Sequence, residues 1–172
     1  MMKRLLSILI LGLLVSYTNL VYGQFANRQA GLRMGYRGGL FYQSGVQAGN
    51  AEVAYNALLS FQKGGIQLTG LKIIYEPSFS RLSPDIYFSW GYGAHLGYLY
   101  SDHLKSMGED YYFEGPRFCP LLGVDGWLSA EYRVHEIPLI VSLNYKPFIE
   151  ITVPAFVKVM PWDFALSVSY VF

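Results

Sequence analysis

The chain has 172 residues, of which 52% are hydrophobic and 17% aromatic. Its 13 Lys and Arg residues nearly balance its 12 Asp and Glu residues, so it lacks the basic surface on which nucleic acid binds. The single cysteine, Cys119, excludes an internal disulfide framework.

The first 23 residues have the pattern of an export signal peptide. Lys3 and Arg4 give a basic start, and the apolar run Leu5–Val15 is shorter than the roughly 20 residues of a transmembrane helix. That shortness argues against the alternative of an uncleaved anchor. The compact residues before Gln24 predict cleavage after Gly23, which leaves residues 24–172 as a single exported domain.

Apolar and polar residues alternate along most of this domain, as in strands with one apolar and one polar face. Residues 31–43 predict a short hairpin that reverses at Gly38–Gly39. The facing of residues 66–76 stays open, because both parities carry apolar side chains. Residues 101–116 predict a polar loop, and the apolar residues 148–161 are expected to continue the strands around another loop. Further strands are predicted at residues 52–62, 86–100, 118–133, 139–146 and 162–172.

These elements predict an all-β fold, an eight-stranded antiparallel up-and-down barrel that spans the outer membrane. An even strand number places both termini on the periplasmic side and the long loops outside. Charges are sparse on the strands, aromatic residues gather at strand ends, and the opposite face is rich in Gly and Ser. These features favour a barrel in lipid. The alternation also fits a soluble periplasmic barrel that carries an apolar ligand, and this alternative stays open.

Several stretches resemble a known family: residues 31–36 (GLRMGY), 68–71 (LTGL), 91–97 (GYGAHLG), 136–139 (EIPL), 142–147 (SLNYKP) and 167–172 (SVSYVF). They are similar to the small OmpA/OmpX-like eight-stranded outer-membrane barrels, especially the short outer-membrane β-barrel proteins of Bacteroidetes. The resemblance implies insertion among outer-membrane lipid and lipopolysaccharide. It also implies that the barrel-assembly machinery reads Tyr170 and Phe172. A structural or surface-interaction role through the outward loops fits it, and no settled activity follows from it.

Eight charged residues are expected to face the barrel interior. An eight-stranded barrel is just wide enough for side chains to fill it, and unpaired charges there would be costly. We therefore expect a paired network that satisfies buried groups, with a conducting pore as the alternative. The residues are Arg33, Glu52, Lys72, Asp125, Glu131, Arg133, Lys146 and Asp163.

The predicted loop 101–116 holds candidates for catalytic chemistry. Ser101, Asp102 and His103 combine the residue types of a nucleophile, a carboxylate and a base, near the leaflet where a lipid-modifying barrel enzyme would act. Adjacent residues rarely reach one another as a triad, so the sequence favours a protein that is not an enzyme.

Metal and cofactor binding find little support in the sequence. Five residues are candidate ligands of a divalent cation: Asp102, His103, Glu109, Asp110 and Glu114. Their spacing in the sequence matches no known calcium-binding loop. No glycine motif for phosphate occurs, and no cofactor is predicted.

Overall fold

The computed structural model describes residues 28–48, 51–76, 85–106, 109–134, 136–153 and 156–172. The predicted signal peptide, residues 1–23, lies outside these ranges. No helix in the described ranges is long and apolar enough to cross a membrane. The strands are β1 (Arg28–Gly35), β2 (Gly38–Ala48), β3 (Ala51–Gln62), β4 (Gly65–Tyr75), β5 (Ile86–Ser106), β6 (Glu109–Arg133), β7 (Leu139–Tyr145), β8 (Phe148–Thr152), β9 (Phe156–Met160) and β10 (Phe164–Val171).

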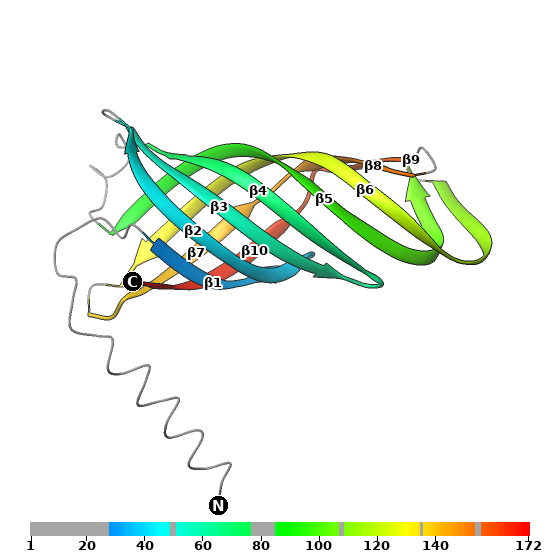
Figure 1. Ribbon diagram of the computed structural model, residues 1–172. Coiled ribbons are helices and arrows are strands. Elements are labelled where there is room, and N and C mark those ends of the chain that lie inside the picture. Colours follow the sequence, from blue (N-terminus) through cyan, green and yellow to red (C-terminus); the bar gives the residue numbers. More distant parts are fainter. Residues whose placement is uncertain (1–27, 49–50, 77–84, 107–108, 135, 154–155) are drawn as a thin grey trace, which may run out of the picture.

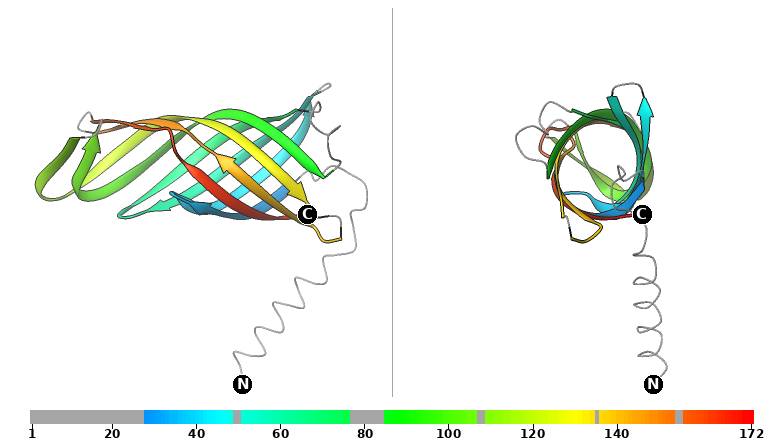
Figure 2. Two further views of the ribbon diagram at one scale, coloured as in Figure 1. Left: turned by 180° about the vertical axis from the view of Figure 1, so that it is seen from behind. Right: turned by 90° about the vertical axis from the view of Figure 1, so that its left-hand side faces the viewer.

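The strands close into an eight-stranded antiparallel barrel, which confirms the predicted fold (Figures 1 and 2). β1 to β6 follow one another around the wall, and β10 joins β1 to β7. β7 and β8 both pair with β6, so they form one strand interrupted at Lys146–Pro147. β9 and β10 are likewise one strand interrupted at residues 161–163, where the inward parity changes from even to odd numbers.

The barrel closes where β1 meets β10 in an antiparallel pair from Gln29↔Val171 to Gly35↔Ala165. Both described chain ends therefore lie at one end of the barrel, as Figure 1 shows. The β1–β2, β3–β4, β5–β6 and β8–β9 connections lie at the other end, as an even strand number requires. In the β3–β4 turn, Gly64 has a φ of 78°, a left-handed conformation that favours glycine.

The predicted polar loop at residues 101–116 is wrong. β5 and β6 continue through it as a hairpin that extends well past the β1–β2 and β3–β4 turns, on the side of the barrel where β8 and β9 also lie (Figure 1). Pairs such as His103↔Tyr112 hold it, and the aromatic run at Tyr111–Phe113 suits a strand. The polar composition that suggested a loop reflects a hairpin with water on its surfaces rather than the absence of strands.

The first reversal also differs from expectation. The chain turns at Tyr36–Arg37, and Gly38 and Gly39 already belong to β2. The Arg37 side chain is 1% exposed, because the turn folds it back into the lumen. Gly39 lies against the β3 backbone at Leu59, where a Cβ would clash, so this glycine allows close strand contact rather than the reversal.

The two faces of the wall have opposite chemistry. On β10, Phe164 and Leu166 face outward and are half exposed, whereas Ser167 and Ser169 are buried in the lumen. The same division runs around the barrel, where aliphatic and aromatic side chains cover most of the outward positions. Part of the lumen is apolar too: Leu71, Ile73, Tyr75, Ala54 and Trp127 pack together inside it.

Candidate functional site

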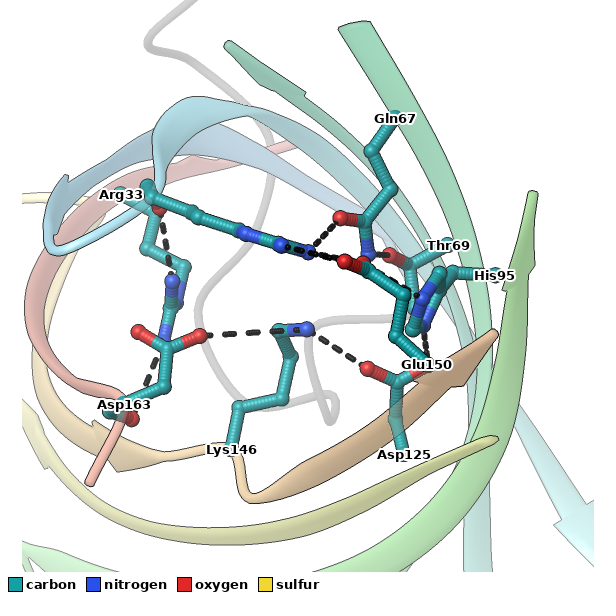
Figure 3. Close-up of polar contacts among 9 residues, drawn as sticks. Arg33, Gln67, Thr69, His95, Asp125, Lys146, Glu150 and Asp163 are labelled. Carbon is teal, nitrogen blue, oxygen red and sulfur yellow. Dashed lines mark hydrogen bonds and ion pairs between the residues drawn. The ribbon is translucent and has the colours of Figure 1, made fainter. Parts of the chain in front are cut away.

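A chain of buried charged side chains crosses the lumen, and we call it the luminal charge network (Figure 3). Its members come from the β1, β5, β6, β7–β8 and β10 regions. Most of its contacts join neighbouring strands of the wall, whereas Glu150 on β8 also reaches Arg37 after β1 and His95 on β5, which do not pair with β8. The network consists of Arg33, Arg37, His95, Asp125, Lys146, Glu150 and Asp163.

Lys146 lies at the centre of this network. Its ammonium donates a hydrogen bond to Asp125 Oδ1 at 2.6 Å and lies 3.9 Å from Asp163 Oδ2. The side chain is fully buried and lies 4.8 Å from the centroid of the Phe148 ring. The interruption at Lys146–Pro147 keeps its backbone paired, because Lys146 N–H donates to Asp163 O and Gly126 N–H donates to Pro147 O. The break therefore costs little while it places a lysine in the lumen.

His95 joins the two carboxylates of the network. Its Nδ1 lies 2.7 Å from Asp125 Oδ2, and its Nε2 lies 3.3 Å from Glu150 Oε2. The ring is 2% exposed and meets the ring of Phe148 edge-on. Gly123 faces it from β6, and a Cβ at that position would collide with the imidazole. The imidazole is thus fixed on three sides.

Arg37 and Glu150 form the paired fork at one end of the network. Arg37 donates from Nη1 to Glu150 Oε2 at 2.9 Å and from Nη2 to Glu150 Oε1 at 3.2 Å. This is the bidentate geometry in which arginine binds a carboxylate most strongly. The guanidinium also donates to Gln67 and lies 4.2 Å from the centroid of the Phe148 ring.

Arg33 and Asp163 form the other end. Arg33 Nη2 donates to Asp163 Oδ1 at 3.1 Å, and Nη1 donates to the carbonyl of Arg37 at 2.8 Å. Three cations, Arg33, Arg37 and Lys146, thus balance three carboxylates. Such balance offsets the desolvation of buried ions, although replacing a whole buried pair with apolar residues often costs nothing. Chemically, the network fills the lumen with large, mutually fixed side chains.

A second polar cluster lies around Tyr75 and Glu131. Tyr75 donates to Glu131 Oε1 at 2.9 Å and accepts a hydrogen bond from Gln43 at 2.7 Å. Asn56 in turn donates to Gln43. Arg133 lies with its guanidinium 3.9 Å from the centroid of the Tyr87 ring. Four of these six side chains are buried, and they continue the filling of the lumen beyond the charge network.

The expected interior residues are placed as follows. Arg33, Asp125, Glu131, Lys146 and Asp163 are buried in the lumen. Arg133 and Glu52 lie half-buried on the inward parities of β6 and β3.

Lys72, which was expected inside, lies instead on the outward face of β4 between Tyr55 and Tyr92. The reason is the apolar luminal cluster. Leu71, Ile73 and Tyr75 pack inward there, which leaves the even positions of β4 outside.

Three members of the network were missing from the expected interior set. Arg37 precedes the turn that the sequence predicts at Gly38–Gly39, and His95 lies within the predicted strand 86–100. Glu150 lies in the apolar residues 148–161, which are expected to pass around a loop. A signal for Glu150 exists, because polar side chains recur on even positions from Ser142 through Asn144 and Lys146 to Glu150, without a phase change at Pro147.

Ser101, Asp102 and His103 lie in β5, where the register to β6 shifts. The Ser101 hydroxyl donates to the carbonyl of His103 at 2.7 Å and accepts the His103 backbone N–H at 3.1 Å. The imidazole of His103 lies 4.8 Å, centroid to centroid, from the ring of Tyr112, and Asp102 is exposed. Both of these hydrogen bonds join the Ser101 hydroxyl to the backbone of His103.

The candidate metal ligands are spread along the same hairpin. Glu114 is exposed, and Glu109 and Asp110 belong to β6 by their backbones. Within the described part of the chain, no three His, Cys, Asp or Glu side chains gather in a way that would hold a metal ion.

The two terminal aromatic residues lie at the barrel seam. Tyr170 is half-buried and pairs with Ala30 and Leu139 of its neighbouring strands. Phe172 is 53% exposed, donates its N–H to Arg28 O, and lies with its ring 6.4 Å from that of Tyr42.

No protein-family model matches the chain, and no curated protein matches it. Among solved structures, the crystal structure of Acinetobacter baumannii CarO2 is similar, at 9% identity, with 87% of this chain and 100% of that chain covered and a TM-score of 0.34. The likeness is too low to bear on activity, so the case for a function comes from the barrel itself.

Proposed function

We propose that this protein is an integral outer-membrane β-barrel of the OmpA/OmpX-like kind, with a sealed lumen, that is not an enzyme. Its role is structural and interactive, through the β5–β6 hairpin that it holds outside the membrane. The barrel-assembly machinery inserts it, and outer-membrane lipid and lipopolysaccharide surround it.

The observation that carries this proposal is the division between the two faces of the wall. Outward positions carry half-exposed apolar side chains such as Leu32, Leu40 and Leu166, whereas the lumen carries Lys146 and Asp163 at zero exposure. In water this arrangement would expose the apolar face and bury the charges. In a bilayer it places hydrocarbon against lipid.

The carrier alternative fits this arrangement poorly. A soluble barrel that holds an apolar ligand needs an apolar lumen with room in it. Here charged side chains occupy the lumen, and Arg37 and Lys146 both lie over the ring of Phe148. An apolar ligand would have to displace these buried ion pairs and leave their charges in an apolar surrounding, which costs free energy.

A catalytic role also has little support. The Ser101 hydroxyl is the candidate nucleophile in the sequence. It forms hydrogen bonds with the backbone N–H and C=O of His103, where the β5–β6 register shifts. A nucleophile needs a base within hydrogen-bond reach of its oxygen, and the carbonyl of His103 cannot take that part.

A fractionation experiment tests location and closure together. Cells that express the full chain are separated into soluble, inner-membrane and outer-membrane fractions, and each is run on a gel boiled and unboiled. We expect an outer-membrane band whose mobility changes on boiling, because a closed barrel resists detergent until it is heated. A soluble band with unchanged mobility would refute the proposal.

Surface labelling of intact cells tests orientation. Tyr112 lies in the outer hairpin and is 77% exposed, whereas Ile137 is exposed in the β6–β7 turn at the opposite end. A membrane-impermeant maleimide should label Tyr112→Cys and not Ile137→Cys. The wild-type chain provides the background, since its Cys119 is 1% exposed. The reverse labelling pattern would contradict the proposed orientation.

A further inference from the structure

A groove of about 600 Å³ runs along the outer surface of the wall, over β5, β6, β7 and β10. Its floor is Ala130, which lies between two larger neighbours, Phe88 on β5 and Leu143 on β7. One row further along the wall, Trp90, Leu128, Tyr145 and Phe164 follow one another across four strands and form a higher rim. The groove therefore exists because one small residue is set among large ones.

The groove has a charged group at one end. Glu76 follows the last residue of β4, and its N–H donates to the carbonyl of Phe88 at 3.1 Å. It is the one charged residue among those that line the groove in the described part of the chain. Glu76 lies toward the end of the barrel that holds the chain termini, and the aromatic rim lies further toward the opposite end.

We propose that this groove binds one phospholipid whose headgroup carries a primary ammonium, with the ammonium at Glu76 and an acyl chain over Ala130. This rests on the proposed insertion in the membrane. Lipid already surrounds the wall in a membrane. The preference of the groove for this one phospholipid over other lipids therefore comes from close packing of the acyl chain and from the ion pair with Glu76. A primary ammonium offers three N–H donors. A carboxylate has about four acceptor positions, so Glu76 accepts an ammonium beside its protein contacts.

The depth of the groove determines how well it binds the acyl chain, and the charge of Glu76 determines which headgroup it prefers. Ala130→Phe fills the floor and removes the space for the chain, whatever the headgroup. Glu76→Gln leaves the space and removes the carboxylate. The charge of the carboxylate disfavours an anionic headgroup, and its oxygens accept charge-assisted N–H bonds that a quaternary ammonium cannot donate. Ala94→Phe is the matched control, because Ala94 also faces outward on β5 but lies outside the groove.

The test is native mass spectrometry of the full barrel in detergent, titrated separately with phosphatidylethanolamine, phosphatidylcholine and phosphatidylglycerol of identical chains. We expect the wild type to prefer phosphatidylethanolamine. Ala130→Phe should weaken its binding about tenfold, the size of one lost packing surface, and Ala94→Phe should not. Glu76→Gln should reduce the preference for the ammonium headgroup by about two- to fivefold, as for an exposed ion pair.

The outcomes separate this inference from the proposed function. Equal binding of the three lipids by the wild type, or equal loss in the Ala130→Phe and Ala94→Phe variants, would overturn the lipid site. The heat-dependent gel shift of each variant reports the barrel independently. If that shift is absent from the wild type, the membrane barrel itself is refuted, and the lipid site with it.

Discussion

At the scale of single residues, Lys146 shows what holds the lumen together. Its ammonium stands between Asp125 and Asp163, and none of the three side chains reaches solvent. We expect Lys146→Met to lower the free energy of unfolding by about 3–5 kcal/mol, because it leaves buried carboxylates with too little positive charge. Urea unfolding of the protein in lipid vesicles, followed by tryptophan fluorescence, measures this change.

Lys72→Met is the natural control for that substitution. The same change on the outward face of β4 removes a charge from a position that faces lipid if the barrel is inserted as proposed, and there a lysine costs free energy rather than contributing it. The expected effect on unfolding is neutral or stabilising. Equal destabilisation by the two variants would mean that the luminal ion pairs contribute nothing specific.

Gly123 tests how tightly the imidazole of His95 is held. A Cβ at Gly123 would meet the His95 ring and the carbonyl of Ile149. His95 cannot easily move, because Asp125 and Glu150 hold its two nitrogens. Gly123→Ala should therefore destabilise the barrel by about 1–3 kcal/mol, as overpacking does.

Gly115→Ala provides the comparison, since a Cβ at Gly115, also on β6, would meet nothing within 4 Å. Thermal unfolding in detergent ranks the two variants. A Gly123→Ala protein as stable as Gly115→Ala would show that the lumen is loosely packed.

At the scale of elements, the β5–β6 hairpin has exposed strand edges. Unpaired backbone groups on such an edge can form hydrogen bonds with another chain and cause aggregation. The β4–β5 pairing ends at Gly65↔Leu99 and the β6–β8 pairing ends at Leu121↔Thr152, so beyond these pairs no strand of the described residues continues the ladder on either side of the hairpin, although β9 lies close to β5. Pro116 and Pro120 remove N–H groups from β6. On β5, the Ser101 hydroxyl satisfies both backbone groups of His103. These features blunt the edges, so we expect the hairpin to act through its side chains.

Ser101→Ala should expose the backbone of His103 and promote pairing between copies of the protein. We expect a dimer in light scattering after gel filtration that is absent from the wild type. Ser101→Thr keeps a hydroxyl and should remain like the wild type. If Ser101→Ala behaves like the wild type and Ser101→Thr forms the dimer, the hydroxyl does not protect the edge.

The elements also show how far the sequence predicts this fold. The alternation in β10 and β6 predicts both the strands and their facing, because one face of each is clearly apolar. It cannot predict the facing of β4, since the lumen beside β4 is itself apolar around Ile73 and Trp127. The partners within the charge network are beyond sequence patterns, because Arg37 and Glu150 meet only when the wall closes.

At the scale of the whole molecule, the closed wall and the filled lumen depend on each other. The seam between β1 and β10 brings Arg33 to Asp163, and the ion pair in turn crosses that seam. Arg37 and Glu150 then join the β1–β2 turn to β8, two elements that no strand pairing of the described residues connects. Side chains thus connect the barrel where its strands are interrupted, which explains why a small barrel carries so many buried charges.

The filled lumen predicts that the wild-type barrel does not conduct ions steadily in a planar lipid bilayer. Arg37→Ala combined with Glu150→Ala leaves the net charge unchanged and removes the bidentate pair that lies over Phe148. Lys146–Asp125 and Arg33–Asp163 remain paired in that variant, so we expect it to fold and to pass a measurable single-channel current. Leu40→Ala combined with Ile151→Ala truncates two outward side chains instead and should stay closed. An open channel in the wild type, or equal currents in the two double variants, would show that the charge network does not seal the lumen.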